Sequence, residues 1–219
     1  MPLPESSKDF YRSLQRIQLV LTVSGRRLWS RMGADFDRSW LDVAPGLVAI
    51  TSAAQLAAAR QAVGYVPAVL AETGQPDEPD ARIRPQAFAG RASDGRSLPG
   101  LLNGAVVRAK DAAPTMPPDM ALAKGGAWLD SVLRTAVADA ARDTTAAEII
   151  ARPNMGWTRA VNPPCCSRCA VLAGRWYRWD ASFQRHLPAL RLLWDSRAGG
   201  RGRGLHDQPS AARGSRFHH

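Results

Sequence analysis

The sequence predicts a mainly α-helical protein with a small β element, an α+β fold whose helices occupy the N-terminal and central parts. Apolar residues recur every three or four positions over residues 9–32 and residues 125–151, the period of an amphipathic helix. A short alternation over residues 156–161 predicts one strand just before the cysteines. With 219 residues, 45% of them hydrophobic, the chain suits one large domain or two small ones, and global disorder is excluded.

Two helices are predicted in the N-terminal part. The first spans residues 9–32, and its apolar stripe consists of Leu14, Ile17, Leu21, Leu28 and Met32. The second begins near Ser52, because Gln55 follows three residues later in a capping-box arrangement. Gly64 and Pro67 are expected to kink or end this second helix.

Residues 74–118 are rich in Pro, Gly and Asp, which predicts irregular chain with at most a short helix over residues 101–109. A long helix follows over residues 125–151, with Asp139 mostly off its apolar stripe. We therefore divide the chain into a helical region (1–73), an irregular connecting segment that drapes over it (74–124), the long helix with a cysteine knuckle (125–186) and a basic tail (187–219).

The net charge is +10, and Arg outnumbers Lys 26 to 3. Such a field attracts nucleic acid, an acidic partner or anionic lipid without selecting among them. The N-terminal residues lack the basic and apolar segments of a secretory signal peptide, and the longest apolar run near the start, residues 17–23, is too short to cross a bilayer. We expect a soluble protein that is made in the cytoplasm, with no membrane partner.

The three cysteines are clustered, with Cys166 and Cys169 forming a Cys-x-x-Cys pair and Cys165 beside it. In a turn between a strand and a helical turn, this pair has the geometry of a zinc knuckle. His186 is the natural third ligand, and Cys165 is an alternative. One such pair is a weak signal, because small, half-buried cysteines in a tight turn give the same pattern.

Other chemistries fit less well. Thiol catalysis would use Cys166 as the nucleophile and His186 as the base, and Asp180 is the only acid placed to orient that base. A redox role would need a βαβ context, which is missing. We assign no catalytic residue and expect no enzyme. The aromatic residues Trp176, Tyr177 and Trp179 stand among arginines and could stack on nucleic-acid bases, although such a run more often forms a core strand edge.

Residues 137–144 (VADAARDT) and 156–186 (GWTRAVNPPCCSRCAVLAGRWYRWDASFQRH) resemble minor head proteins of the phage Mu F-like group, in the type found in actinobacterial phages and prophages. The resemblance extends diffusely over residues 10–186 and is specific only in the cysteine segment. The matching positions are Cys166, Cys169, Leu172, Ala173, Gly174, Tyr177 and His186.

The resemblance implies a structural minor capsid protein that acts in procapsid assembly near the portal. Its implied partners are the portal protein, the major capsid and scaffold proteins, and packaged DNA, and its implied location is the virion head. Some relatives are labelled capsid maturation proteases, but no Ser/His/Asp arrangement supports that label here. The alternative from charge and aromatic content is a nucleic-acid-binding zinc-knuckle module.

The chain departs from the family pattern after His186, where a Cys-x-Cys motif is expected and an Arg- and Gly-rich tail follows. Deleting one base from GC-rich codons for this tail restores that motif, so we interpret residues 187–219 as frameshifted or truncated. Without that motif the available ligands are Cys166, Cys169 and His186, with Cys165 as an alternative. An intact family member would hold zinc, but we do not expect this chain to bind zinc stoichiometrically. Residues from about 196 onward are expected to be unstructured and dispensable.

Overall fold

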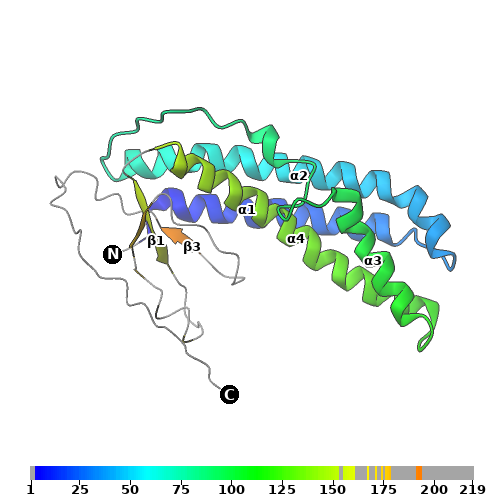
Figure 1. Ribbon diagram of the computed structural model, residues 1–219. Helices are drawn as coiled ribbons and strands as arrows, with labels where there is room; N and C mark the ends of the chain where they lie inside the picture. Colours follow the sequence, from blue (N-terminus) through cyan, green and yellow to red (C-terminus); the bar gives the residue numbers. More distant parts are fainter. Residues whose placement is uncertain are drawn as a thin grey trace, which may run out of the picture.

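The computed structural model describes residues 3–152, 155–160, 167, 171, 174, 176–178 and 191–193. The helices are α1 (Glu5–Trp29), α2 (Phe36–Glu72), α3 (Leu98–Ala112) and α4 (Pro118–Ile150), with a 3-10 turn η1 (Pro85–Phe88). The strands are β1 (Gly156–Ala160), β2 (Trp176–Arg178) and β3 (Arg191–Leu193) (Figure 1). The prediction of a mainly α protein is confirmed.

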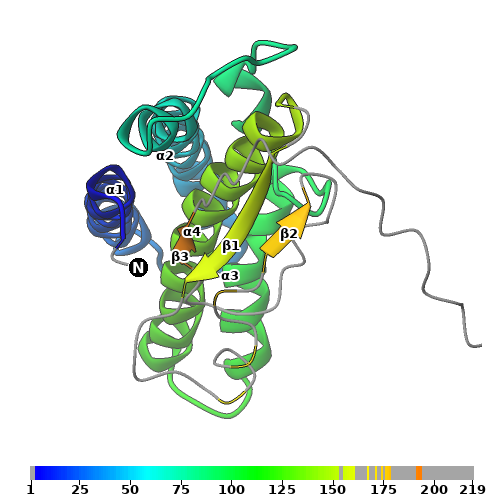
Figure 2. The same ribbon diagram turned by 90° about the vertical axis from the view of Figure 1, so that its left-hand side faces the viewer.

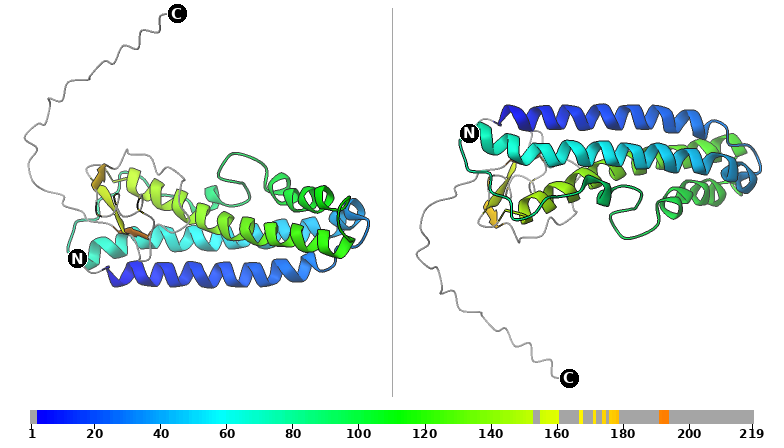
Figure 3. Two further views of the ribbon diagram at one scale, coloured as in Figure 1. Left: turned by 90° about the horizontal axis from the view of Figure 1, so that it is seen from below. Right: turned by 90° about the horizontal axis from the view of Figure 1, so that it is seen from above.

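The helices form an elongated bundle in which α1, α2 and α4 run side by side, and α3 packs against α4 away from the sheet (Figures 1 and 3). The sheet lies at the end where α1 begins and α4 finishes. All four helices contribute to one hydrophobic core, whose fully buried side chains include Leu47, Leu98, Leu102, Leu129 and Leu133. This core therefore spans the boundaries proposed near residues 73 and 124.

Helix α2 is much longer than predicted. It begins at Phe36, where the Asp35 carboxylate accepts the Arg38 N–H, so the prediction of a start and capping box at Ser52 is wrong. It also continues through Pro45 and Pro67 to Glu72. An interior proline costs about 3 kcal/mol, and burial of apolar side chains along the whole helix outweighs that cost.

The connecting segment is more ordered than predicted. Residues 98–112 form α3, which Ser97 caps by accepting the Gly100 N–H, and α4 starts at Pro118 rather than at residue 125. Residues 73–97 are irregular as expected, apart from η1, and drape along α2 (Figure 1). Gln55 holds them there, with its Nε2 donating to the Arg91 carbonyl at 2.8 Å and its Oε1 accepting the Gly90 N–H at 2.9 Å.

Helix α2 is also long and apolar enough to cross a membrane, judged by length and composition alone. A single helix of this kind is weak evidence for a membrane span, since a core helix of a helical bundle passes the same test. Here α2 packs against α1, α3 and α4.

Candidate functional site

The predicted metal-ligating residues Cys165, Cys166, Cys169 and His186 all lie outside the described residues. The strands around them are described, and their pairing sets the topology of the region. Strand β1 is central and pairs antiparallel with β2 on one side and with β3 on the other. The three cysteines therefore belong to the chain that connects β1 to β2, and His186 belongs to the chain that connects β2 to β3.

The register places the β1–β2 connection at the end of the sheet where β3 begins, whereas the β2–β3 connection starts at the opposite end, beside Gly156, and finishes at this one. Thr158 pairs with Trp176 and Ala160 pairs with Arg191, so the cysteine segment leaves β1 and re-enters β2 near the point where β3 begins. Cys165 follows Ala160 by five residues, and His186 precedes Arg191 by five. Five residues span at most about 18 Å, so this topology permits the cysteines and His186 to share a site.

The sheet is anchored to the bundle through a second, smaller hydrophobic cluster. Trp157 of β1 and Met155 are 2% and 7% exposed, and they pack against the end of α2 and of α4. The bundle residues of this cluster are Tyr65, Val66, Val69, Leu70 and Ile149, with Phe10 of α1 at its edge. The Phe10 ring stacks on the Tyr65 ring with centroids 4.3 Å apart. Three helices thus contribute to the cluster that holds β1.

A buried ionic cluster holds the chain between α4 and β1. The Arg152 guanidinium donates to the Glu148 carboxylate at 2.5 Å and to Asp77 at 2.7 Å. Arg152 and Glu148 are 3% and 4% exposed. Burial raises the pKa of Glu148 above its ordinary value, and the hydrogen bond and charge of Arg152 oppose that rise. Because Asp77 comes from the connecting segment, Arg152 links that segment to the base of the sheet.

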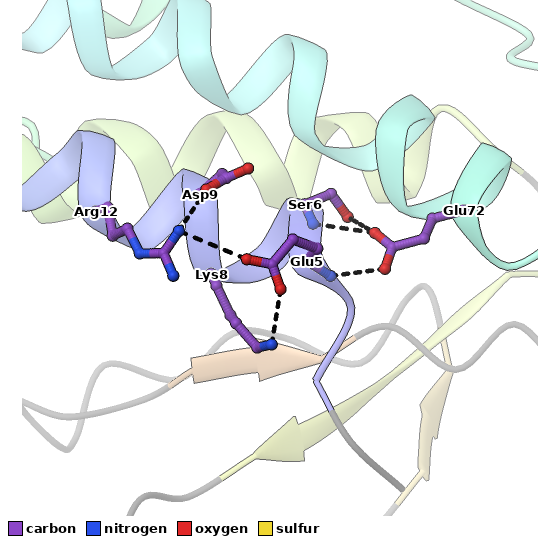
Figure 4. Close-up of polar contacts among 6 residues, drawn as sticks. All are labelled: Glu5, Ser6, Lys8, Asp9, Arg12 and Glu72. Carbon is purple, nitrogen blue, oxygen red and sulfur yellow. Dashed lines mark hydrogen bonds and ion pairs between the residues drawn. The ribbon is translucent and has the colours of Figure 1, made fainter.

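The N-terminus of α1 is capped by the C-terminal end of α2. The Glu72 carboxylate accepts the backbone N–H groups of Glu5 and Ser6, at 2.6 and 3.0 Å, and the Ser6 hydroxyl at 2.6 Å (Figure 4). These hydrogen bonds, led by that of the Ser6 hydroxyl, lower the pKa of Glu72. Lys8 and Arg12 then pair with the acids of the first helical turns. This cluster fastens the start of α1 to the end of α2.

Several of these polar residues were not predicted. Asp139 was placed mostly off the apolar stripe of its helix, yet it is 5% exposed and accepts the Ser93 hydroxyl at 3.0 Å and Arg142 at 2.5 Å. Gln55, Glu148 and Arg152 are buried in the same way. A polar residue at a helical position next to buried ones is the sequence signal for them. The partners of Gln55, and the second partners of Asp139 and Arg152, lie far along the chain.

The described part of the chain contains few of the side chains that usually bind metals or act as nucleophiles. It contains no histidine and no cysteine, because these residues occur only at positions 165, 166, 169, 186, 206, 218 and 219. Among the residues that the structure describes, no group of three or more His, Cys, Asp or Glu side chains could hold a metal ion. All histidines and cysteines of the chain thus lie within residues 161–219.

Comparisons with protein-family models, curated proteins and solved structures found no match. The proposals below rest on the residues of the chain and on their arrangement.

Proposed function

We propose that this protein is a structural minor capsid protein of a tailed phage or prophage, similar to the Mu F-like group, that acts in head assembly near the portal. The observation that supports this proposal is the order of the helices and strands around the cysteines. Helix α4 leads into β1, the cysteines follow β1, and β2 follows the cysteines. The Mu F-like group has the same order: a long helix, a strand, the pattern Cys-x-x-Cys-x-x-Leu-Ala-Gly and an aromatic strand.

The helical body is consistent with a structural role. Its buried polar side chains join segments of the chain to each other, as Gln55 joins α2 to residues 90 and 91. No histidine or cysteine is available in this body to act as a base or a nucleophile. The proposed partners are the portal, scaffold and major capsid proteins, with the virion head as the location.

Co-assembly tests this proposal. The protein is co-expressed with the portal, scaffold and major capsid proteins of a tailed phage with a Mu F-like head protein, and procapsids are purified and analysed by quantitative mass spectrometry. We expect a few copies per particle, retained after nuclease treatment. Deleting the portal gene should abolish incorporation, whereas an unrelated soluble protein of equal size should stay outside. Procapsids that assemble fully and contain none of the chain would refute the proposal.

A second function, nucleic-acid binding by the cysteine region, is favoured by the distribution of charge. Residues 1–152 hold 18 basic and 16 acidic side chains, whereas residues 153–219 hold 11 basic and 3 acidic ones. Most of the net positive charge thus lies with the cysteines, the aromatic residues of β2 and the tail. A DNA binder of this kind loses affinity steeply as salt rises, because phosphate contacts release counterions. Co-assembly that persists without DNA distinguishes the head role.

A further inference from the structure

The outer face of α1 carries exposed apolar side chains that the bundle does not use. Leu19 and Val20 are 64% and 66% exposed, and Val23 is 40% exposed. These are large exposed fractions for aliphatic residues in the middle of a 25-residue helix. Helix α1 lies on the outer side of the bundle, and the opposite side of α1, with Leu21 and Trp29, is buried (Figures 2 and 3). The apolar patch therefore faces away from the core.

Arginines bracket this patch along the same face of the helix. The stripe consists of Arg12, Arg16, Leu19, Val20, Val23 and Arg27, all exposed and spaced by three or four residues around the apolar centre. It is about 22 Å long. Arg12 pairs with Asp9 at 2.8 Å. Arg16 and Arg27 form no ion pair within the described part of the chain.

We propose that this α1 stripe is a docking surface for an amphipathic helix of another protein, with an apolar centre and acidic residues on either side. Charge complementarity selects this occupant. The apolar centre needs an apolar counterpart, and the unpaired guanidinium groups of Arg16 and Arg27 need carboxylates at matching distances along the helix. Such an occupant packs helix against helix along α1, with anchors about one helical turn apart.

Other occupants fit less well. A second copy docking through the same stripe would bring the arginines of one copy against those of the other, in parallel or antiparallel pairing, and like charges repel. Residues 187–219 of this chain carry six arginines and two aspartates, so they are repelled too. A membrane surface is disfavoured because interfacial helices present a larger apolar face with aromatic residues, whereas this patch has three aliphatic ones. The inference does not depend on the proposed head role.

The test uses two synthetic helical peptides of about 20 residues, long enough to cover the stripe. They share a central apolar stripe and differ in flanking residues, one with glutamates and one with lysines. Fluorescence anisotropy is measured against the full chain. We expect the glutamate peptide to bind with an affinity that falls as salt rises, and the lysine peptide not to bind. Equal binding of both peptides, or of neither, would overturn the proposal.

Two variants locate the binding. Leu19→Gln with Val20→Gln and Val23→Gln should weaken the glutamate peptide at least tenfold, and Leu41→Gln, which changes a 74% exposed residue of α2, should not. All four positions are exposed and helical, so circular dichroism should be unchanged. Binding that survives the triple variant contradicts the assignment.

Charge reversal gives an independent readout. Arg16→Glu with Arg27→Glu should switch the preference to the lysine peptide, while Arg108→Glu on α3 should leave the preference as it is. An unchanged preference in the double variant would refute charge matching.

Light scattering tests whether a second copy binds the stripe, and vesicles containing acidic phospholipid test whether a membrane does. A dimer, or vesicle binding, that disappears in the triple variant would assign the stripe to a second copy or to a membrane and overturn the proposal.

Discussion

Buried polar side chains in this protein join parts of the chain that are distant in sequence. Gln55 is 2% exposed and bonds to the backbone of Gly90 and Arg91. Asp139 accepts the hydroxyl of Ser93, and Arg152 reaches Asp77. A buried polar group without a partner costs about 1–3 kcal/mol, so each pair favours one path for the connecting segment across the bundle.

The start of α2 gives a test at the scale of one residue. Asp35→Ala removes the side chain that accepts the Arg38 N–H, and we expect the free energy of unfolding to fall by about 1 kcal/mol. Ser52→Ala should cost much less, because Ser52 lies in the interior of the helix. Urea unfolding of both variants measures this difference. The opposite ranking would restore Ser52 as the N-cap.

The pKa of Glu148 gives a test by pH. Burial raises this pKa above the ordinary 4.5, so the folded protein binds the proton more tightly than the unfolded chain does. The contribution of Glu148 to stability is therefore full below pH 4.5 and is lost as the pH rises through the raised value. Relative to Glu148→Gln, the wild type should gain stability as the pH falls from 7 to 4.5.

Chemical denaturation at a series of pH values, with the difference between wild type and Glu148→Gln plotted against pH, measures this effect. Carboxylates that do not contact this cluster contribute equally to both proteins, so the difference reports on Glu148 together with its partners Arg152 and Asp77. A wild type that instead loses stability relative to Glu148→Gln would mean that pairing with Arg152 at 2.5 Å outweighs burial.

At the scale of elements, small residues set the distance between α3 and α4. A Cβ on Gly125 would lie 2.6 Å from the carbonyl oxygen of Ala105 and 3.1 Å from the Cβ of Ala109. The first of these atoms is backbone, so the two helices would have to separate. The same Cβ would also meet the Trp29 ring at 2.9 Å, which ties α1 to this crossing.

Gly125→Ala should therefore destabilise the protein by about 1–3 kcal/mol, the cost of overpacking a core, despite the higher helix propensity of alanine. Gly64→Ala is the matched control, because it lies inside α2 with no atom within 4 Å of the added Cβ. It should stabilise by about 0.5–1 kcal/mol. Thermal and urea unfolding of both variants checks the signs. Equal effects would mean that α3 and α4 do not approach closely at Gly125.

At the scale of the whole molecule, the hydrophobic clusters and the excess charge occupy different parts of the chain. Among the residues that the structure describes, the buried residues of both clusters end at Trp157, whereas residues 153–219 hold 11 basic and 3 acidic side chains. We expect deletion of residues 196–219 to change the melting temperature by less than about 2 °C, since a loss of 1 kcal/mol shifts a domain of this size by about 2–4 °C. Circular dichroism melting checks this, and a larger drop would show that the tail contributes to the core.

The metal content of the whole chain is a separate prediction. We expect the purified protein to hold no stoichiometric zinc, because only Cys166, Cys169 and His186, with Cys165 as an alternative, are available as ligands. Elemental analysis measures it, and the double variant Cys166→Ser with Cys169→Ser is the control for adventitious metal. One zinc per chain that is lost in this variant would make Cys165 a fourth ligand and would argue against a frameshifted site.

Periodicity alone determined the class of this protein and its strongest elements. The apolar repeats of α1 and α4 and the alternation of β1 are local patterns, and such patterns follow from residues a few positions apart. The helix that ends near residue 151 and the strand at 156 were predicted for this reason. The order of helix, strand and cysteines, on which the proposed function rests, is likewise a property of the sequence.

Tertiary structure decided the remaining features. Pro45 and Pro67 indicate breaks by local rules, and only burial against α1, α3 and α4 carries α2 through them. The length of helix α3 was underestimated because half of its buried residues are alanines, which give a weak apolar pattern. These small residues let α3 pack closely against α4 at Gly125. The distant partners of Gln55, Asp139 and Arg152, which are Gly90, Ser93 and Asp77, lie 35 to 75 residues away. Contacts at such separations depend on how the helices pack, and no local pattern encodes them.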